Sequence, residues 1–242
     1  MQKIYPPFLK GQMALPFHAL NKLHPYLYDA KILSLGYPDL MVSAEEIEKL
    51  FGYKPTRFTE AAKWHGLKNP CPETLELFER LGSELTVVDF TQESGVEKIA
   101  DLNYPHDFGK FDLVIDSGTL EHCFNIGQAM LNAVNSVKVG GAIFHLSPLD
   151  VLNHGFYNMN PTLFNDFYLQ NEWDIKEVKI MPSSSPVIHT TNRFTMYTEH
   201  IIRVLVERPH DKPIKYPIQT KYLQKMAVRD EIHLQNGTVP TL

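Results

Sequence analysis

The sequence predicts one α/β domain around a doubly wound, mostly parallel sheet of seven strands, Rossmann-like, with helices on both faces. Three observations predict this. Apolar, β-branched runs alternate with segments of helical character. The chain has 242 residues, 43% of them hydrophobic, which is enough for one core without stabilising disulfides. Polar side chains also gather just after the predicted strands. We therefore expect residues 1–242 to form a single domain.

The first part of the chain supplies a helix and the first strand. Residues 1–30 are rich in proline, aromatic residues and histidine, and they are expected to form an N-terminal helical segment, with a helix from about Met13 to Tyr28. The apolar run Lys31–Leu35 reads as a buried strand. A glycine, Gly36, follows it, and the chain then turns.

A helical insertion is expected between the first and second strands. Ser43 is a suitable N-cap, Glu46 completes a capping box, and Gly52 ends the helix. Pro72 can open a second helix that ends at Gly82. Residues 43–82 are therefore predicted to form an inserted helical cap, which can fold over a ligand as a lid.

The rest of the chain continues the alternation of strands and helices. The connection between the last two strands is too long for a tight hairpin and is a candidate functional loop. Residues 209–242 are rich in proline at their start and are expected to form a C-terminal tail with a short helix near 220–230. The expected strands are 84–90, 111–115, the run "KVGGAIFHLSP" read as a turn and strand, 172–181 and 200–209, and the expected helices follow Asn125 and span 161–170.

Composition excludes several classes of protein. The net charge is −5, and no basic run is interleaved with aromatic residues, so a nucleic-acid partner is disfavoured. The two cysteines, Cys71 and Cys123, have no metal or redox spacing. No segment approaches about 18 apolar residues, and the N-terminus lacks an apolar signal core. We expect a soluble, cytoplasmic protein with no membrane partner, and a homodimer is left open.

Polar residues gather at the ends of the predicted strands. In doubly wound sheets, ligands bind beyond the carboxyl ends of the strands, at the point where the strand order reverses. Asp89 can accept hydrogen bonds from both hydroxyls of a ribose. Its alternative role is a surface cap of the next segment. Asp101 can accept a hydrogen bond from the exocyclic amine of an adenine, or it can be a turn residue before Asn103.

The central run "IADLNYPHDFGKFDLVIDSGTLEHCFNIGQAMLNAVNSVKVGGAIFHLSP" resembles the corresponding segment of class I S-adenosylmethionine-dependent methyltransferases. Those proteins show an acid followed by Leu and Pro, then Phe-Asp before two aliphatic residues, an "LEH"-like turn, a helix, a Gly pair and a strand. The resemblance extends over residues 31–148. A further run, "HGFYNMNPTLFNDFY", resembles a segment of methyltransferases associated with surface-polysaccharide clusters.

The resemblance implies S-adenosyl-L-methionine as cofactor and a small-molecule or sugar-like acceptor, methylated at oxygen or nitrogen. The implied cofactor-binding residues are Gly36 of the loop with Leu35 before it, Asp89 at the ribose with Phe90 after it, Asp101 and Leu102 at the adenine, and Asp116, Ser117 and Gly118 near the methionine part. In the turn after Gly36, the Asp39 carboxylate can pair with the ammonium. Two features depart from the family. The glycines after Gly36 are absent, and the gap from Gly36 to Asp89 is about thirty residues longer than usual. The cofactor has no phosphate, so it does not need the second glycine that lets a dinucleotide's pyrophosphate approach the backbone.

A methyl acceptor that carries a proton needs a base. Histidine suits that role because its ordinary pKa is near 6.5. We predict His154 as the first candidate, His122 as the second, and Tyr157 as a residue that orients a substrate hydroxyl. Their structural alternatives are a helix-start His122 bonded to backbone, a His154 packed on Phe156 and a space-filling Tyr157. His145 lies inside a strand and reads as a core residue.

Other chemistries find less support in the sequence. No metal site is expected, because no HxxxH pair occurs and no carboxylate cluster can be assembled from the sequence. The sequence contains no G-x-S-x-G motif, so a serine hydrolase is also disfavoured. Two alternatives stay open: a lyase or cyclase that acts on the same cofactor, and an inert methyltransferase-like binding partner. A Rossmann oxidoreductase is more distant, since the pyrophosphate loop is missing.

Overall fold

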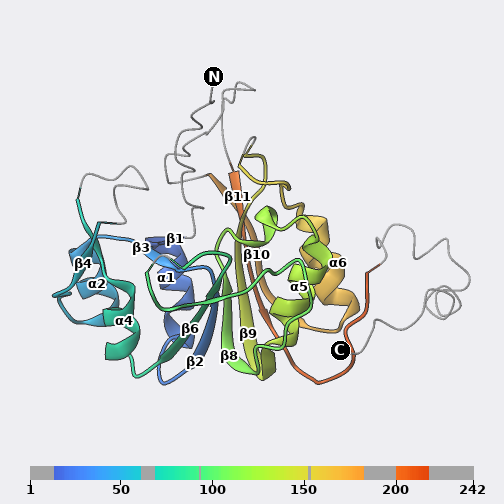
Figure 1. The fold of residues 1–242 in the computed structure, drawn as a ribbon, viewed down its shortest axis with the longest axis horizontal. Helices are drawn as coiled ribbons and strands as arrows, with labels where there is room; N and C mark the ends of the chain where they lie inside the picture. The colour runs from blue at the N-terminus through green and yellow to red at the C-terminus, as the bar shows by residue number, and fades with distance from the viewer. Residues whose placement is uncertain (1–13, 61–68, 93, 152–153, 183–199, 218–242) are drawn as a thin grey trace, which may run out of the picture.

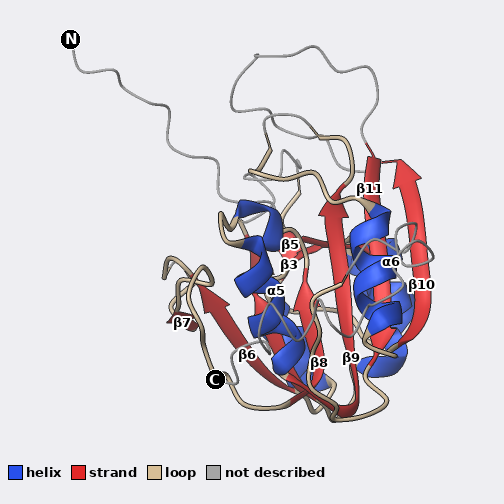
Figure 2. Ribbon diagram, turned by 90° about the vertical axis from the view of Figure 1, so that its right-hand side faces the viewer, coloured by secondary structure: helices blue, strands red, loops and turns tan. Residues whose placement is uncertain are grey.

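The computed structural model describes residues 14–60, 69–92, 94–151, 154–182 and 200–217. A seven-stranded central sheet has the strand order β10-β11-β9-β8-β2-β6-β7. Helices cover both of its faces, with α1, α2 and α4 on one side and α5 and α6 on the other (Figures 1 and 2). The predicted fold class is confirmed. The strands of this sheet are β2 (Lys31–Leu35), β6 (Glu84–Asp89), β7 (Glu97–Ile99), β8 (Phe111–Asp116), β9 (Val137–Pro148), β10 (Asp174–Pro182) and β11 (His200–Glu207).

The remaining elements are helices and two small ribbons. Short strands pair as β1 with β3, in parallel, and as β4 with β5, antiparallel. The helices are α1 (Phe17–Leu23), α2 (Ala44–Phe51), α4 (Thr74–Arg80), α5 (Ile126–Asn135) and α6 (Pro161–Gln170), with single 3-10 turns η1 (His24–Tyr26) and η2 (Leu120–His122), and the short strands are β1 (Ala14–Pro16), β3 (Asp39–Met41), β4 (Phe58–Thr59) and β5 (Cys71–Pro72).

The strand order reverses between β2 and β8. From β2 the chain continues to β6 on one side, whereas β8 is followed by β9 on the other, and all four of these strands are parallel. Strand β11 runs antiparallel to both of its neighbours. The carboxyl ends of β2, β6, β8 and β9 therefore meet at one edge of the sheet, where doubly wound folds bind their ligands.

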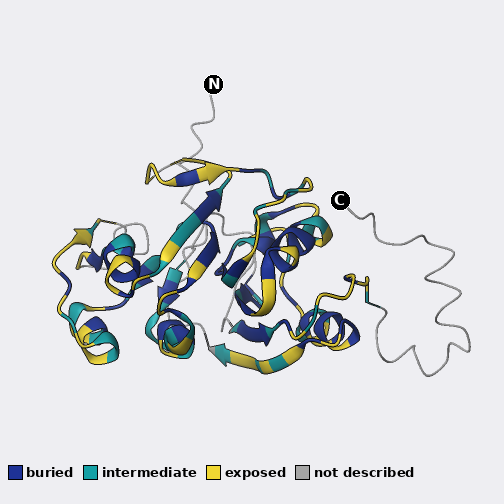
Figure 3. Cartoon of the chain, turned by 90° about the horizontal axis from the view of Figure 1, so that it is seen from below, coloured by how far each residue is buried: buried dark blue, intermediate teal, exposed yellow. Residues whose placement is uncertain are grey.

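The hydrophobic core has one layer on each face of the sheet. Successive strand residues point to opposite faces, so Ile32 packs with the leucines of α1 and α4, and Leu33 packs with α5 and α6. In the view of Figure 3, buried segments of the strands lie between these two groups of helices. Burial on both faces explains why β2 and β8 read as continuous apolar runs.

Local capping chemistry places several helices where the sequence predicted them. Ser43 and Glu46 form the capping box of α2, and Gly52 closes that helix with a φ of 73°. The Asn125 side chain caps α5 by accepting a hydrogen bond from the Gln128 N–H. These features depend on residues within one turn of each other, so the sequence alone reveals them.

Other boundaries differ from the prediction. The N-terminal helix begins at Phe17, after an extended Pro16, and not near Met13. Pro72 does not open a helix but lies in β5, and the Glu73 side chain caps α4 by accepting from two backbone N–H groups. Strand β9 begins at Val137 and continues through its Gly pair, so the residues expected to form a turn belong to the strand. The sequence also gave no indication of β7, a short and mostly exposed strand.

The described part of the insertion packs against the sheet. Ile47 of α2 and Leu77 and Phe78 of α4 are buried in the same core layer as α1. The insertion is thus part of the core, and its use as a lid stays a prediction. Residues 61–68, the long connection at 183–199 and the helix expected near 220–230 lie outside the described residues. Within the described ranges, no helix has the length and apolar character that a bilayer span needs.

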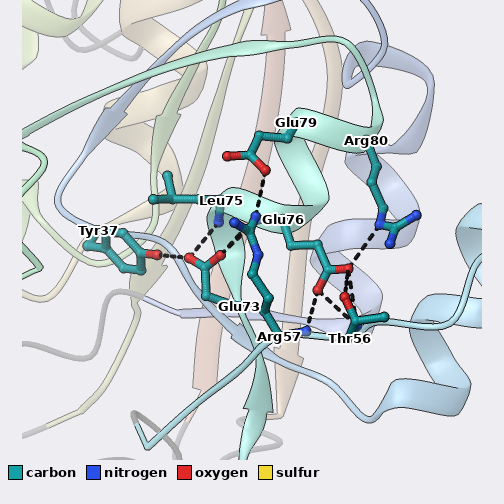
Figure 4. Close-up of polar contacts among 8 residues, drawn as sticks. All are labelled: Tyr37, Thr56, Arg57, Glu73, Leu75, Glu76, Glu79 and Arg80. Atoms are coloured by element: carbon teal, nitrogen blue, oxygen red, sulfur yellow. Dashed lines mark hydrogen bonds and ion pairs between the residues drawn. The ribbon is translucent and has the colours of Figure 1, made fainter.

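Within the insertion, a buried carboxylate, Glu76 of α4, holds the loop at Thr56 and Arg57 (Figure 4). It accepts hydrogen bonds from the Thr56 hydroxyl at 2.8 Å, the Arg57 N–H at 2.6 Å and the Arg80 Nε at 2.9 Å. Burial opposes its charge, but the hydrogen bonds from Arg57 and Thr56 prevail and lower the pKa of Glu76 to about 2. The ionised form of Glu76 is therefore preferred in the folded chain.

We expect Glu76→Gln to lower the free energy of unfolding at pH 7 by on the order of 3 kcal/mol. Because the folded pKa lies below the ordinary value of 4.5, this stabilisation is present above about pH 5 and is lost as pH falls toward 2. Urea unfolding of both proteins at pH 7 and pH 3 measures the difference. Glu79→Gln, on the exposed side of the same helix, is the control, and equal losses for both variants would contradict the prediction.

Candidate functional site

The turn after β2 is held by its neighbours on both sides. The Gly36 N–H donates to the Val88 carbonyl of β6 at 2.7 Å, and the Ser34 hydroxyl donates to the Gly36 carbonyl at 2.7 Å. The Thr119 hydroxyl, beyond β8, donates to the Leu35 carbonyl at 2.5 Å. Gly36 has a φ of 82°, which side chains disfavour, so glycine is needed at this position even without the usual glycines after it.

The rest of this loop leads into the small β1–β3 ribbon. Asp39 is half-buried and pairs across the ribbon with Ala14. The Ala14 carbonyl in turn accepts a hydrogen bond from the Ser117 hydroxyl at 2.6 Å. The ribbon therefore brings the Asp39 loop and the Ser117 turn together at the carboxyl edge, and it engages the hydroxyl of Ser117 in doing so.

Asp89 lies at the end of β6, beside the Gly36 turn. Its carboxylate is half-buried, and its Oδ1 accepts a hydrogen bond from the Thr91 N–H at 3.1 Å. The next residue, Phe90, is 72% exposed, so its ring is open to solvent. A carboxylate and an uncovered aromatic ring are thus adjacent at the strand end.

Asp101 and Leu102 follow β7 in the chain. The Asp101 Oδ1 accepts from both the backbone N–H and the side-chain amide of Asn103, at 3.0 and 2.7 Å. This is the turn arrangement that the sequence allowed as an alternative. Leu102 is buried in the core. Both of these hydrogen bonds end on Oδ1, and among the described residues none donates to the Oδ2 of Asp101.

Asp116, at the end of β8, is fully buried and uses both carboxylate oxygens inside the protein. Oδ1 accepts from the N–H groups of Thr119 and Leu120, both at 3.2 Å, and Oδ2 lies 2.7 Å from the His145 Nδ1. The His145 Nε2 lies 2.6 Å from the Tyr168 hydroxyl. His145 is therefore the satisfied core residue that the sequence predicted. Because both oxygens of Asp116 are engaged inside the protein, Asp116 holds the turn at Gly118 in place.

The predicted catalytic histidines lie together. The His154 Nε2 is 3.3 Å from the Glu121 Oε1, and the rings of His122 and His154 are 4.9 Å apart between centroids. One ligand atom of each of the three residues lies within 4.8 Å of those of the other two. Burial raises the pKa of Glu121, and burial followed by the nearby His154 lowers the pKa of His122 to about 4.

The segment around His154 is fixed to the turn at Glu121. The N–H groups of Phe156 and Tyr157 both donate to the Glu121 carbonyl, at 2.8 and 3.3 Å. The Tyr157 hydroxyl donates to the Phe124 carbonyl at 2.8 Å. Tyr157 thus orients its own segment, and a contact of Tyr157 with substrate stays a prediction. In the described part of the chain the Phe156 ring pairs with Phe124, whereas the His154 ring pairs with His122.

Sequence reasoning missed the place of Glu121 in this cluster. Glu121 and His122 are adjacent in the chain, but His154 comes 32 positions after His122, beyond the whole of β9. The sequence showed only that both segments follow strand ends. A separate groove of about 490 Å³, between α1 and the β10–β11 pair, is lined by none of the predicted site residues.

Comparisons with known proteins give structural likeness only. No family model matches the chain, and no curated protein sequence matches it. A methyltransferase from Burkholderia thailandensis that acts on 1,6-didemethyltoxoflavin is 11% identical, with 80% of this chain and 78% of that one covered, at a TM-score of 0.48.

Two further solved structures are similar to the same degree. A putative methyltransferase from Bacillus halodurans is 10% identical, covering 80% of this chain and 99% of that one, with a TM-score of 0.48. For TehB from Haemophilus influenzae the identity is 11%, the TM-score is 0.46, and this chain spans 57% of its length. All three TM-scores lie below 0.5, so none of these likenesses carries an argument about function.

Proposed function

We propose that the chain is an S-adenosylmethionine-dependent methyltransferase that acts on a small-molecule or sugar-like acceptor, at oxygen or nitrogen. One observation carries this proposal: the Gly36 turn and the Asp89 carboxylate lie at the carboxyl ends of adjacent parallel strands. The hydrogen bond from the Gly36 N–H joins the turn to the carbonyl of Val88, the residue before Asp89. They stand beside the switch point between β2 and β8, where doubly wound sheets bind ligands.

The residues present fit the chemical groups of this cofactor. The half-exposed Asp89 carboxylate has one oxygen free of the Thr91 contact and can accept from ribose hydroxyls. The exposed ring of Phe90 offers an apolar face to the adenine, and Asp101 retains an oxygen for the adenine amine. Asp39 and the turn 116–118 lie at the same edge, where an ammonium and a carboxylate need partners.

The cofactor, when bound, would supply an activated methyl group. The chain's own contribution is to position the acceptor, to exclude water and to accept the acceptor's proton. His154 suits the last task, because Glu121 lies 3.3 Å from its Nε2 and can hold the proton of that nitrogen. The Nδ1 of His154 is then the basic atom. Such a base contributes about 10²–10⁴-fold to the rate, and positioning contributes further.

The proposal is tested by calorimetric titration with S-adenosylhomocysteine, with NADH as a control ligand. We expect micromolar binding of S-adenosylhomocysteine alone, and at least tenfold weaker binding by Asp89→Ala, because the ribose loses its hydrogen-bond acceptor. Asp174→Ala is the matched control and should bind S-adenosylhomocysteine normally, because β10 is the outermost strand on the side of the sheet away from β6.

Each failure has a distinct meaning. Unchanged affinity in Asp89→Ala would remove Asp89 from the ribose role but leave the enzyme assignment standing. Binding of neither ligand by the wild-type chain would overturn the proposal and favour an inert binding partner with the same fold. Breakdown of S-adenosylmethionine that is incubated with the chain in the absence of an acceptor would instead indicate a lyase or cyclase.

A further inference from the structure

We propose that Glu121, His122 and His154 form a binding site for one divalent transition-metal ion, with Zn²⁺ as the best-fitting ion. The site goes beyond the proposed methyl transfer, and metal binding can be measured without turnover. The three side chains come from the turn η2 after β8 and from the segment after β9. The fold brings these two segments together at the carboxyl edge of the sheet.

The separations between the side chains suit a small ion. Metal–ligand bonds of about 2.0–2.1 Å in a tetrahedral arrangement place neighbouring ligand atoms about 3.3–3.4 Å apart. The Glu121 Oε1 and the His154 Nε2 are already 3.3 Å apart. All three ligand atoms lie within 4.8 Å of one another, so a side-chain shift on the order of 1 Å completes the arrangement.

Two buried atoms of this cluster have no partner among the described residues, and this is an independent indication of a ligand. They are the Oε2 of Glu121, a side chain with 0% exposure, and the Nε2 of His122. An unpaired polar atom in the interior costs about 1–3 kcal/mol, and more if charged. A cation between the two histidines and Glu121 would neutralise the buried carboxylate and give the His122 Nε2 the partner that it lacks within the described ranges.

The backbone holds the cluster in place before any ion arrives. The Phe156 N–H donates to the Glu121 carbonyl at 2.8 Å. A Cβ at Gly155 would lie only 2.7 Å from that same carbonyl oxygen, so glycine permits the close approach of the two segments. His154 retains 13% exposure, which leaves a route from solvent. A site whose ligands are already positioned binds its ion with a smaller ordering cost.

The ligand set selects the class of ion. Two imidazoles and one carboxylate are donors that Zn²⁺ accepts, whereas Mg²⁺ and Ca²⁺ prefer oxygen ligands. Three protein ligands leave a fourth position open, as in catalytic zinc sites. If the proposed function also holds, that position is where an acceptor oxygen binds and loses its proton more readily. His154 then serves as a metal ligand in the loaded protein and not as the base.

The test is a zinc titration of the full chain, first freed of metal by chelator dialysis, in competition with a chromophoric chelator. We expect one equivalent of Zn²⁺ per chain with a submicromolar dissociation constant, and no comparable binding of Mg²⁺. His122→Ala and His154→Ala should each weaken zinc binding at least tenfold. His24→Ala is the matched control, because His24 contacts Leu50 and Tyr28 on the other face of the fold.

Cobalt substitution gives a second measurement. Co²⁺ in the site should produce visible absorption that both histidine variants lose while their circular dichroism is unchanged. Zinc binding of the two variants equal to that of the wild type would overturn the site, as would less than one equivalent in the wild type. A chain that binds no zinc can still bind S-adenosylhomocysteine, so the two titrations test the metal site and the proposed function separately.

Discussion

The His154→Ala chain is expected to lose methyl transfer by about 10²–10⁴-fold and still bind S-adenosylhomocysteine normally. His154 lies beside the buried Glu121, at the end of the sheet where the cofactor is proposed to bind, but it belongs to a different segment from the proposed cofactor residues. Its loss should therefore affect the chemical step and not cofactor affinity. A panel of sugars and phenols is first screened for an acceptor that the wild-type chain methylates. With that acceptor, the rate of methyl transfer is measured as the rate of S-adenosylhomocysteine release.

Two comparisons show what His154 does. His24→Ala should keep full activity, since His24 lies outside the cluster. Chelator treatment of the wild type distinguishes the two roles of His154: lost activity restored by Zn²⁺ indicates a metal ligand, and unaffected activity indicates a base held by Glu121. Full activity of His154→Ala would place the proton acceptor elsewhere, with His122 as the next residue to replace.

The Asp116→Ala chain is expected to be less stable by about 3–5 kcal/mol, the usual cost of removing one partner of a buried ionisable pair. Asp116 and His145 are both fully buried, and the chain of contacts ends at the Tyr168 hydroxyl. Without the carboxylate, the Nδ1 of His145 and the N–H groups of Thr119 and Leu120 lose their acceptor. For a chain of this length the melting temperature should fall by about 6–20 °C.

Urea unfolding of Asp116→Ala, His145→Ala and the double variant measures the coupling between the two residues. We expect the double variant to lose less than the sum of the single losses, because each single change leaves a buried group unpaired. Asp174→Ala, on the exposed edge strand, should change stability by less than about 0.5 kcal/mol. A loss below about 1 kcal/mol for Asp116→Ala would show that the Asp116–His145 pair does not support the turn.

The sequence by itself determined the features that rest on neighbouring residues. The apolar run of β2, the capping box of α2 and the Asn125 cap of α5 lie where they were predicted. The alternation of strands and helices also determined the class of fold and the strand ends where polar residues gather. These features are readable because their hydrogen bonds and apolar periodicity span only a few positions.

Only the tertiary structure decided the rest. Strand β7 has no pattern of its own and exists because it pairs with β6. Pro72 stands in a strand because the insertion folds back on itself, and both oxygens of Asp116 turn inward because His145 lies beside it on β9. The meeting of Glu121, His122 and His154 likewise depends on two strand ends arriving at one edge. Such contacts join distant segments, and the free energy that selects them is that of the assembled core, which no local pattern contains.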